Sequence, residues 1–351
     1  MNRTVLAILI LRCLLFCTVG NAQQRLRLLA EDTFEGLLSD TVTEQINVLV
    51  IHGTGLKKNT YADRMMSYCF KQVNAGKPDT GNVYLSADGL ITVRKISGVF
   101  GGKRKLSFYV VHWSDYTKLA KEQVHDTERD KNVNRGLFSR FLKNKVIIRE
   151  FYDFVIFSNV EFKHQIKLAM DKTFDDILAK SAGKNSALNL VSGSLGSSIF
   201  IEYVNRLQDT VRSRSITKTE KTNVERKIDY VKGTTCRFFM LTNQVNFLES
   251  IIAQKPTRVE AIAPEKTIQV VAFRHTNDAL SFYLPQATAA RFVDFMQVNT
   301  INVRYKNVLR GNFLMKAHTR PMELKKIYGA VLLGSTYRKV KKDKRSGGKK
   351  K

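Results

Sequence analysis

The chain has 351 residues, of which 43% are hydrophobic, and a formal net charge of +27. This length and apolar content are ample for one large buried core, and five prolines are too few for long proline-rich linkers between domains. The sequence has no RRM, zinc-finger or helix-turn-helix signature, which argues against a nucleic-acid-binding module. It also has no CxxC pair or histidine cluster at metal-binding spacing, so we expect neither a metal nor another cofactor.

The N-terminus has the composition of a signal peptide. A positive residue, Arg3, precedes an apolar run over 5–15 that only Arg12 interrupts, and small residues stand at 20–22. We expect cleavage after Ala22 and export to the periplasm or the medium. An uncleaved N-terminal membrane anchor is the alternative, although the run is shorter than the roughly 20 apolar residues that cross a bilayer.

The first buried strand is predicted over 46–51, where nearly every residue is aliphatic or β-branched. Such a run is typical of a parallel strand that is covered on both faces. His52, Gly53, Thr54 and Gly55 follow, and glycines there let the backbone turn sharply and present N–H groups to an oxyanion. We expect the backbone N–H of Thr54 to be one such donor. An ordinary tight turn is the alternative.

A second apolar strand, 188–192, runs into a small-residue turn around Ser194 and then into a helix-like segment. This arrangement lifts a serine hydroxyl above the sheet edge and aims the next backbone N–H at the group under attack. Ser194 is therefore the candidate nucleophile, and the N–H of Leu195 is the second candidate oxyanion donor. The G-x-S-x-G pattern is incomplete because Ser192 replaces its first glycine, and a Ser/Gly-rich loop is the alternative.

Two later segments offer an acid and a base. Asp278 follows a predicted strand at 267–273, where a carboxylate can orient a histidine, although an Asx turn or helix cap is the alternative. His318 follows a strand-like segment at 301–305. His275 is the competing base, but it stands only three positions before Asp278, so we favour His318.

These segments together resemble the bacterial α/β-hydrolases of the esterase and lipase type. In that family a strand end, a W-S segment, a serine elbow, an acid loop and a histidine loop follow one another in this order. The corresponding segments here are VIHGTG (50–55), HWSD (112–115), SGSLGS (192–197), FRHTNDALS (273–281) and AHT (317–319). The resemblance implies an α/β fold in which helices cover both faces of a mostly parallel sheet.

The resemblance also implies hydrolysis of carboxylic esters through an acyl-enzyme. Ser194 would be the nucleophile, Asp278 the orienting acid and His318 the general base. The backbone N–H groups of Thr54 and Leu195 would bind the oxyanion.

The chain departs from the family pattern at two places. Gly193 stands where members often carry histidine, and Arg320-Pro321 stands where members carry a glycine and an aromatic residue. Proline restricts the residue before it, which affects the loop that would place His318. The alternative function is therefore a catalytically inactive relative that binds anionic lipid or polysaccharide through its basic surface.

We expect a single α/β-hydrolase domain over 23–336. The segment 115–180 is longer than a simple crossover needs and has apolar residues at helical intervals, so we interpret it as a helical insertion, a cap over the site. Helices that only cover the sheet are the alternative. The basic segment 337–351 is expected to be a disordered, solvated tail.

Basic residues are concentrated at 103–105, at 212–232 and in the C-terminal tail. Such a positive field attracts polyanions, and the candidate partners are anionic lipid surfaces and lipopolysaccharide phosphates, with nucleic acid ranked low. A solvated surface that has no specific partner is the alternative.

Two cysteines, Cys69 and Cys236, remain after removal of the signal peptide. A disulfide between them is one interpretation in an oxidising compartment. Burial of Cys236 in the core beside its apolar strand is the other.

Overall fold

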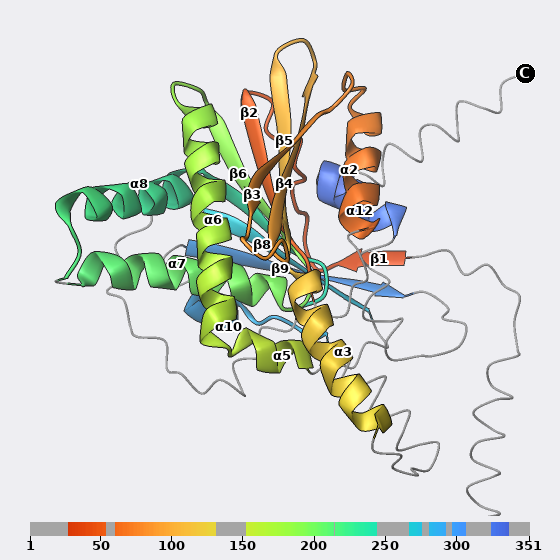
Figure 1. The fold of residues 1–351 in the computed structure, drawn as a ribbon. Helices are drawn as coiled ribbons and strands as arrows, with labels where there is room; N and C mark the ends of the chain where they lie inside the picture. Colours follow the sequence, from red (N-terminus) through yellow and green to blue (C-terminus); the bar gives the residue numbers. More distant parts are fainter. Residues whose placement is uncertain are drawn as a thin grey trace, which may run out of the picture.

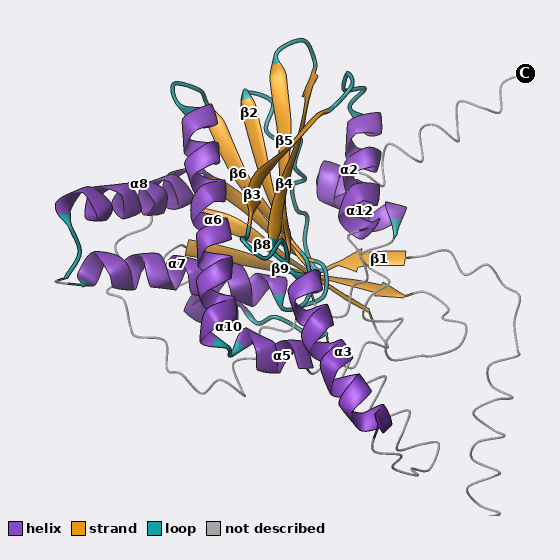
Figure 2. Cartoon of the chain, viewed as in Figure 1, coloured by secondary structure: helices purple, strands orange, loops and turns teal. Residues whose placement is uncertain are grey.

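The computed structural model is an α/β fold, and it describes residues 27–53, 60–130, 152–213, 215–243, 267–275, 281–292, 297–306 and 324–336 (Figures 1 and 2). Its strands are β1 (Arg27–Ala30), β2 (Gln45–Ile51), β3 (Asp79–Leu85), β4 (Thr92–Phe100), β5 (Arg104–His112), β6 (Ser186–Ser192), β7 (Thr235–Met240), β8 (Thr267–His275) and β9 (Gln297–Lys306). Its helices are α2 (Thr60–Gln72), α3 (Ser114–Asp130), α5 (Tyr152–Phe157), α6 (Val160–Ser181), α7 (Gly196–Arg212), α8 (Lys218–Thr234), α10 (Gln286–Phe292), α12 (Lys325–Leu333) and the 3₁₀ turn η3 (Gly334–Thr336).

The strands form one mixed sheet in the order β1-β9-β8-β7-β6-β2-β5-β4-β3. The six strands from β5 to β9 along this order pair in parallel, and β1, β3 and β4 add antiparallel pairs at the two sides. All seven residues of β2 are buried, because the strand lies between two parallel neighbours and under helices on both faces. The expected α/β fold with a mostly parallel sheet is confirmed.

The strand order reverses at β2. The chain leaves β2 on one side to build β5 and returns on the other side as β6, so that β2 pairs with both. Open α/β sheets bind ligands in the crevice beyond the carboxyl ends of the strands at such a reversal. Ile51, at the end of β2, is in register with Ser192, at the end of β6, and Ser194 therefore follows directly at this point.

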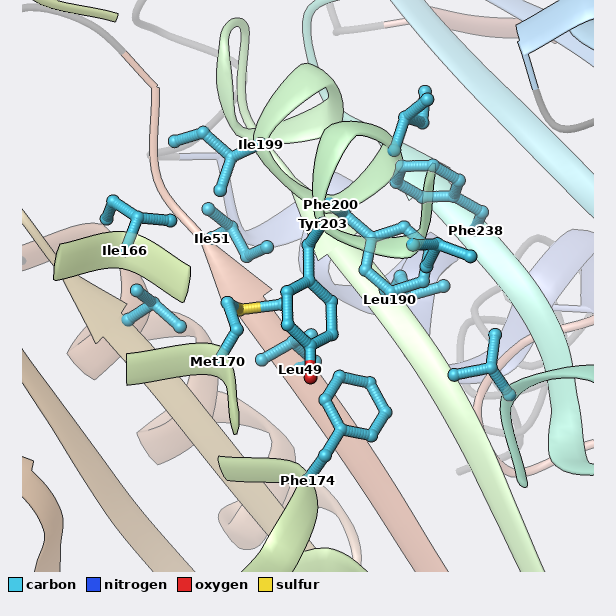
Figure 3. Close-up of a cluster of buried hydrophobic side chains, with 14 of the residues drawn as sticks. Leu49, Ile51, Ile166, Met170, Phe174, Leu190, Ile199, Phe200, Tyr203 and Phe238 are labelled. Atoms are coloured by element: carbon cyan, nitrogen blue, oxygen red, sulfur yellow. The ribbon is translucent and has the colours of Figure 1, made fainter. Parts of the chain in front are cut away.

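Two apolar cores lie on the two faces of the sheet. Helices α2 and α12 contribute to one, and α6, α7 and α8 contribute to the other. Figure 3 shows part of the second core, where side chains of α6 and α7 meet those of β2, β6 and β7. This separation into two cores confirms that helices cover both faces.

Helix α6 covers the sheet. Its apolar side chains at helical spacing, Phe162, Ile166, Met170, Phe174 and Ile177, are all buried in the second core. The C-terminal part of the expected insertion at 115–180 is thus a sheet-covering helix, and residues 131–151 of that segment lie outside the described residues. Val155 on α5 does not belong to this core, since its side chain is 63% exposed.

A buried ion-pair network joins three of the helices that cover this face. The ammonium of Lys227 on α8 lies 3.1 Å from the carboxylate of Asp171 on α6, and Tyr203 on α7 donates a hydrogen bond of 2.9 Å to the same carboxylate. Burial acts to raise the pKa of Asp171, but the hydrogen bond from Lys167 and the charge of Lys227 outweigh it and hold that pKa below its ordinary value.

Cys69 on α2 and Cys236 on β7 are both free thiols, so the disulfide interpretation is wrong. Cys69 is buried, and burial raises the pKa of its thiol. Cys236 is half-buried, and its Sγ lies 3.3 Å from the carbonyl oxygen of Thr234. Among the described helices, none is long and apolar enough to span a bilayer.

Replacing Lys227 with alanine tests how much the buried network stabilises the fold. The change removes the buried ammonium from Asp171, which keeps Lys167 and Tyr203 as partners, and we expect the free energy of unfolding to fall by about 2 kcal/mol in urea denaturation. Lys221→Ala is the matched control, because Lys221 lies exposed on the same helix, and its effect should stay within about 0.5 kcal/mol. Equal effects of the two substitutions would show that the network contributes nothing specific.

Candidate active site

Ser194 occupies a strained turn between β6 and α7. Its φ is 49°, and among the described non-glycine residues only Asn74 also has a positive φ. The left-handed region costs an ordinary L-residue about 1–2 kcal/mol, so the surroundings must hold the backbone there. A serine with this conformation at a strand-to-helix turn has the backbone geometry of a nucleophile elbow.

Two glycines let the turn after β2 touch the serine turn directly. A Cβ at Gly196 would lie 2.3 Å from the carbonyl oxygen of Ile51, and a Cβ at Gly53 would lie 2.5 Å from the carbonyl oxygen of Gly193 and from the Cβ of Ser194. Contacts this short leave no room for a side chain. Gly196, the second glycine of the pattern, is thus required by the close approach of the two backbones.

Ser192 fills the place of the missing first glycine without disturbing the turn. Its side chain is buried, and its Oγ lies 2.6 Å from the Oγ of Ser197 on the first turn of α7. This hydrogen bond between the strand and the helix satisfies both hydroxyls. The incomplete G-x-S-x-G pattern is therefore compatible with the elbow.

The turn is held by hydrogen bonds from both neighbouring strands. Gly193 N–H donates to the carbonyl oxygen of Ile51 at 3.1 Å. Ser194 N–H donates to Thr242, which follows β7, with distances of 3.0 Å to its carbonyl oxygen and 2.8 Å to its Oγ1. Thr242 has no sequence motif around it, because only the pairing of β6 with β7 brings it beside the serine.

Leu195 lies where an oxyanion donor is expected. It is the N-cap residue of α7, and its side chain forms no capping hydrogen bond to the first turn of the helix. The first N–H groups of any helix lack a partner within the helix and carry the positive end of its dipole. The backbone N–H of Leu195 therefore belongs to a region that favours negative charge.

His52 joins the ends of β2 and β5. Its Nε2 accepts a hydrogen bond of 3.1 Å from the backbone N–H of Trp113, so its proton is on Nδ1, which donates to the carbonyl oxygen of Gly53 at 2.7 Å. The Trp113 indole stacks on the imidazole at 4.7 Å between centroids and donates to the His52 carbonyl oxygen. Burial lowers the pKa of His52 to about 3, so this ring is neutral and structural.

The segments that carry the other predicted site residues leave the sheet at the same edge as Ser194. Thr54, Asp278 and His318 themselves lie outside the described residues. Because β2, β8 and β9 are parallel to β6, their carboxyl ends share its edge, and the predicted oxyanion, acid and histidine segments follow these ends. The three segments thus follow strands that end at the same edge of the sheet. The catalytic roles of Thr54, Asp278 and His318 stay predictions.

Phe282 and Leu284, which follow the predicted acid segment, are hydrogen-bonded to residues beside and on the sheet. Phe282 N–H donates to the carbonyl oxygen of Asn243 at 3.0 Å, and the Asn243 side chain donates back to the Phe282 carbonyl oxygen at 3.2 Å. The buried amide of Asn302 on β9 pairs with both backbone groups of Leu284 at 2.9 Å. These hydrogen bonds hold Phe282 beside the end of β7 and Leu284 against β9.

His275, the competing base, is the last residue of β8. Its side chain is 3% exposed and meets the ring of Tyr305 on β9 edge-on, with 5.0 Å between centroids. It is thus packed in the sheet, whereas His318 belongs to the segment after β9. Among the described residues, no group of three or more His, Cys, Asp or Glu side chains is placed to hold a metal ion.

Comparisons with known proteins give only distant likenesses. No family model matches the chain, and no curated protein matches it. A structure of YahD with malic acid has a TM-score of 0.27 and 7% identity, covering 85% of this chain and 97% of YahD. Acetyl xylan esterase 1 from Thermoanaerobacterium sp. JW/SL YS485 has a TM-score of 0.21 and 6% identity, covering 77% of this chain and 95% of the esterase. Likenesses this low identify neither a shared fold nor a shared activity.

The neutral state of His52 predicts a pH dependence of stability. The unfolded chain takes up a proton on this histidine below about pH 6.5, whereas the folded chain does not until about pH 3. Stability is therefore fully present above the unfolded pKa and is lost as the pH falls. In His52→Gln, the slope of unfolding free energy against pH should be smaller by about 1 kcal/mol per pH unit between about pH 6 and about pH 5.

Urea denaturation at several pH values measures this slope. His164→Gln is the control, since His164 is exposed on α6, and it should leave the slope unchanged. An unaltered slope in His52→Gln would rule out the buried, neutral imidazole as a source of the pH dependence.

Proposed function

We propose that this chain is a serine hydrolase of the α/β-hydrolase type that cleaves carboxylic esters. The observation that carries the proposal is the conformation of Ser194, a buried serine with a φ of 49° between β6 and α7 at the point where the strand order reverses. Natural chains keep such strain where a side chain must be aimed. The order of segments along the chain, with serine, acid and histidine after β6, β8 and β9, supports the same proposal.

In the proposed mechanism His318 removes the proton of Ser194 as the hydroxyl attacks the ester carbonyl carbon. Asp278 holds the imidazole in the required tautomer and stabilises its positive charge. The N–H groups of Thr54 and Leu195 stabilise the tetrahedral oxyanion, each contributing about 3–4 kcal/mol to lowering the barrier. The protonated histidine then gives its proton to the leaving alcohol, and water releases the acyl group by the same steps in reverse.

A role for α3 and α5 as a cap over the site belongs to this proposal. Both helices come after Trp113, whose ring stacks beside the turn that follows β2. Lys121 on α3 and the buried carboxylate of Asp153 on α5 form an ion pair of 2.5 Å, which holds the two helices together. A joined pair of helices of this kind can line an acyl or alcohol pocket and limit the access of water.

A fluorophosphonate probe tests the proposal, because it forms a covalent adduct only with an activated serine. We expect mass spectrometry to locate the adduct on Ser194. Labelling should be absent from Ser194→Ala and from His318→Ala, and hydrolysis of p-nitrophenyl acetate should fall by about 10⁴ or more in both.

Two further variants sharpen the result. Ser198→Ala removes a neighbouring buried serine on α7 and should retain full labelling. If His275→Ala abolishes labelling while His318→Ala retains it, the base is His275. Folded protein that gives no adduct would contradict the hydrolase proposal and favour the inactive, anion-binding alternative.

We also propose that the protein is exported after removal of residues 1–22, which lie outside the described residues. The mature protein isolated from its native host should begin at Gln23, as intact-mass and N-terminal peptide measurements would show. A chain that keeps the apolar run at 5–15 would instead indicate the membrane-anchored alternative.

A further inference from the structure

A polar cavity of about 370 Å³ lies between the C-terminal half of α6 and the strands β3, β4 and β5. Its lysines come from three elements: Lys95 from β4, Lys105 from β5, and Lys172 and Lys180 from α6. Lys172, Asp176 and Lys180 are four residues apart, so they share one face of the helix. The cavity is thus made by residues that are distant in sequence.

The cavity is remote from Ser194. Lys105 is in register with Gln45, the first residue of β2, whereas the serine turn touches Ile51 at the other end of that strand. At about 3.3 Å per residue, the two ends of β2 are about 20 Å apart. The cavity therefore lies at the amino edge of the parallel strands, opposite the proposed catalytic edge.

One lysine of the cavity is already neutralised. Lys95 forms an ion pair of 2.5 Å with Asp176, and its ammonium lies 5.2 Å from the centre of the Tyr109 ring. The Tyr109 hydroxyl donates to the same Asp176 carboxylate at 2.8 Å. This pair leaves Asp176 little capacity to neutralise the other lysines.

The remaining lysines give the cavity a net positive charge. Among the described residues, Lys105, Lys172 and Lys180 form no salt bridge, and Asp79 is the one other carboxylate that lines the cavity. Burial lowers the pKa of Lys105, and the charges of Lys95, Lys184 and Lys180 lower it further, by more than the charge of Asp79 raises it. An anion that binds among these lysines offsets their repulsion of the partly buried Lys105 ammonium.

We propose that this cavity binds a phosphate group through Lys105, Lys172 and Lys180. Its volume lies within the range of about 300–1,000 Å³ that is typical of small-ligand sites. Each ammonium offers three donors, and a phosphate offers several acceptor oxygens and about two negative charges. The ligand is a phosphorylated small molecule or the phosphate of a lipid headgroup, since the chemistry of recognition is the same. The site is independent of the hydrolase proposal.

Calorimetric titration of the full chain with pyrophosphate is the first test. We expect the double variant Lys105→Gln/Lys172→Gln to raise the Kd for pyrophosphate at least tenfold. Lys218→Gln/Lys221→Gln, which removes two exposed lysines from α8, is the control of equal charge and should change the Kd less than twofold. Equal losses in both variants, or no binding by the wild type, would overturn the proposal, because the charge would then act non-specifically or not at all.

A variant that keeps every charge makes the test independent of lysine removal. Gly81 on β3 lines the cavity opposite Lys95 in the sheet register, and a Cβ at Gly81 meets nothing within 4 Å. Gly81→Val should therefore fit the strand, occupy part of the cavity and weaken pyrophosphate binding at least fivefold. Unchanged binding in this variant would place the anion elsewhere and overturn the proposal. This variant decides the question if the lysine variant does not fold.

Vesicles distinguish the two sources of phosphate. Sedimentation with phosphatidylcholine vesicles that contain phosphatidic acid should be lost in the Lys105→Gln/Lys172→Gln variant if the ligand is a lipid headgroup. If vesicle binding is absent or unchanged while pyrophosphate binding is lost, the site takes a soluble phosphate. Either result supports the cavity as a phosphate site and names its source.

Discussion

The contact between two backbone turns, one after β2 and one after β6, constrains the edge of the sheet at which the parallel strands end. Parallel pairing puts Ile51 in register with Ser192, and the turns then approach so closely that only glycine fits at Gly53 and Gly196. The chain must turn away directly after β6 to avoid the turn that follows β2, and Ser194 takes a φ of 49° there. The position of the serine is therefore fixed by backbone atoms, which are the least adaptable part of a fold.

The imidazole beside the serine turn is uncharged, whereas lysines gather at the opposite edge of the sheet. His52 stays neutral beside the serine turn because it is buried and its two ring nitrogens are hydrogen-bonded as donor and acceptor. A cation there would compete with the proposed imidazolium and oxyanion for the same electrostatic field. At the amino edge, Lys105 and Lys180 lie near one another without a described ion-pair partner. The two ends of β2 thus differ in what lies beside them, a neutral imidazole at one end and a group of lysines at the other.

The sequence predicted those features that depend on neighbours along the chain. Continuous apolar runs indicated the buried strands, and small residues after one of them indicated the turn at Ser194. Features that depend on neighbours in space were missed or wrong. Thr242 has no motif around it, and the phosphate cavity needs α6 to lie over β3, β4 and β5. Helical spacing does not separate buried from exposed apolar positions, because periodicity identifies an apolar stripe but not what covers it, and Val155 on α5 is exposed.

Helix α6 connects the two edges physically. Near its start Phe162 meets the Trp113 ring at 5.5 Å between centroids, and near its end Lys180 lines the basic cavity. These positions are 18 residue steps apart, which corresponds to about 27 Å of helix. Coupling between the edges would require α6 to have two arrangements that both sites can bias. The buried network at Asp171 ties the middle of α6 to α7 and α8, so any movement of this helix that linked the two edges would have to break the network or carry α7 and α8 with it.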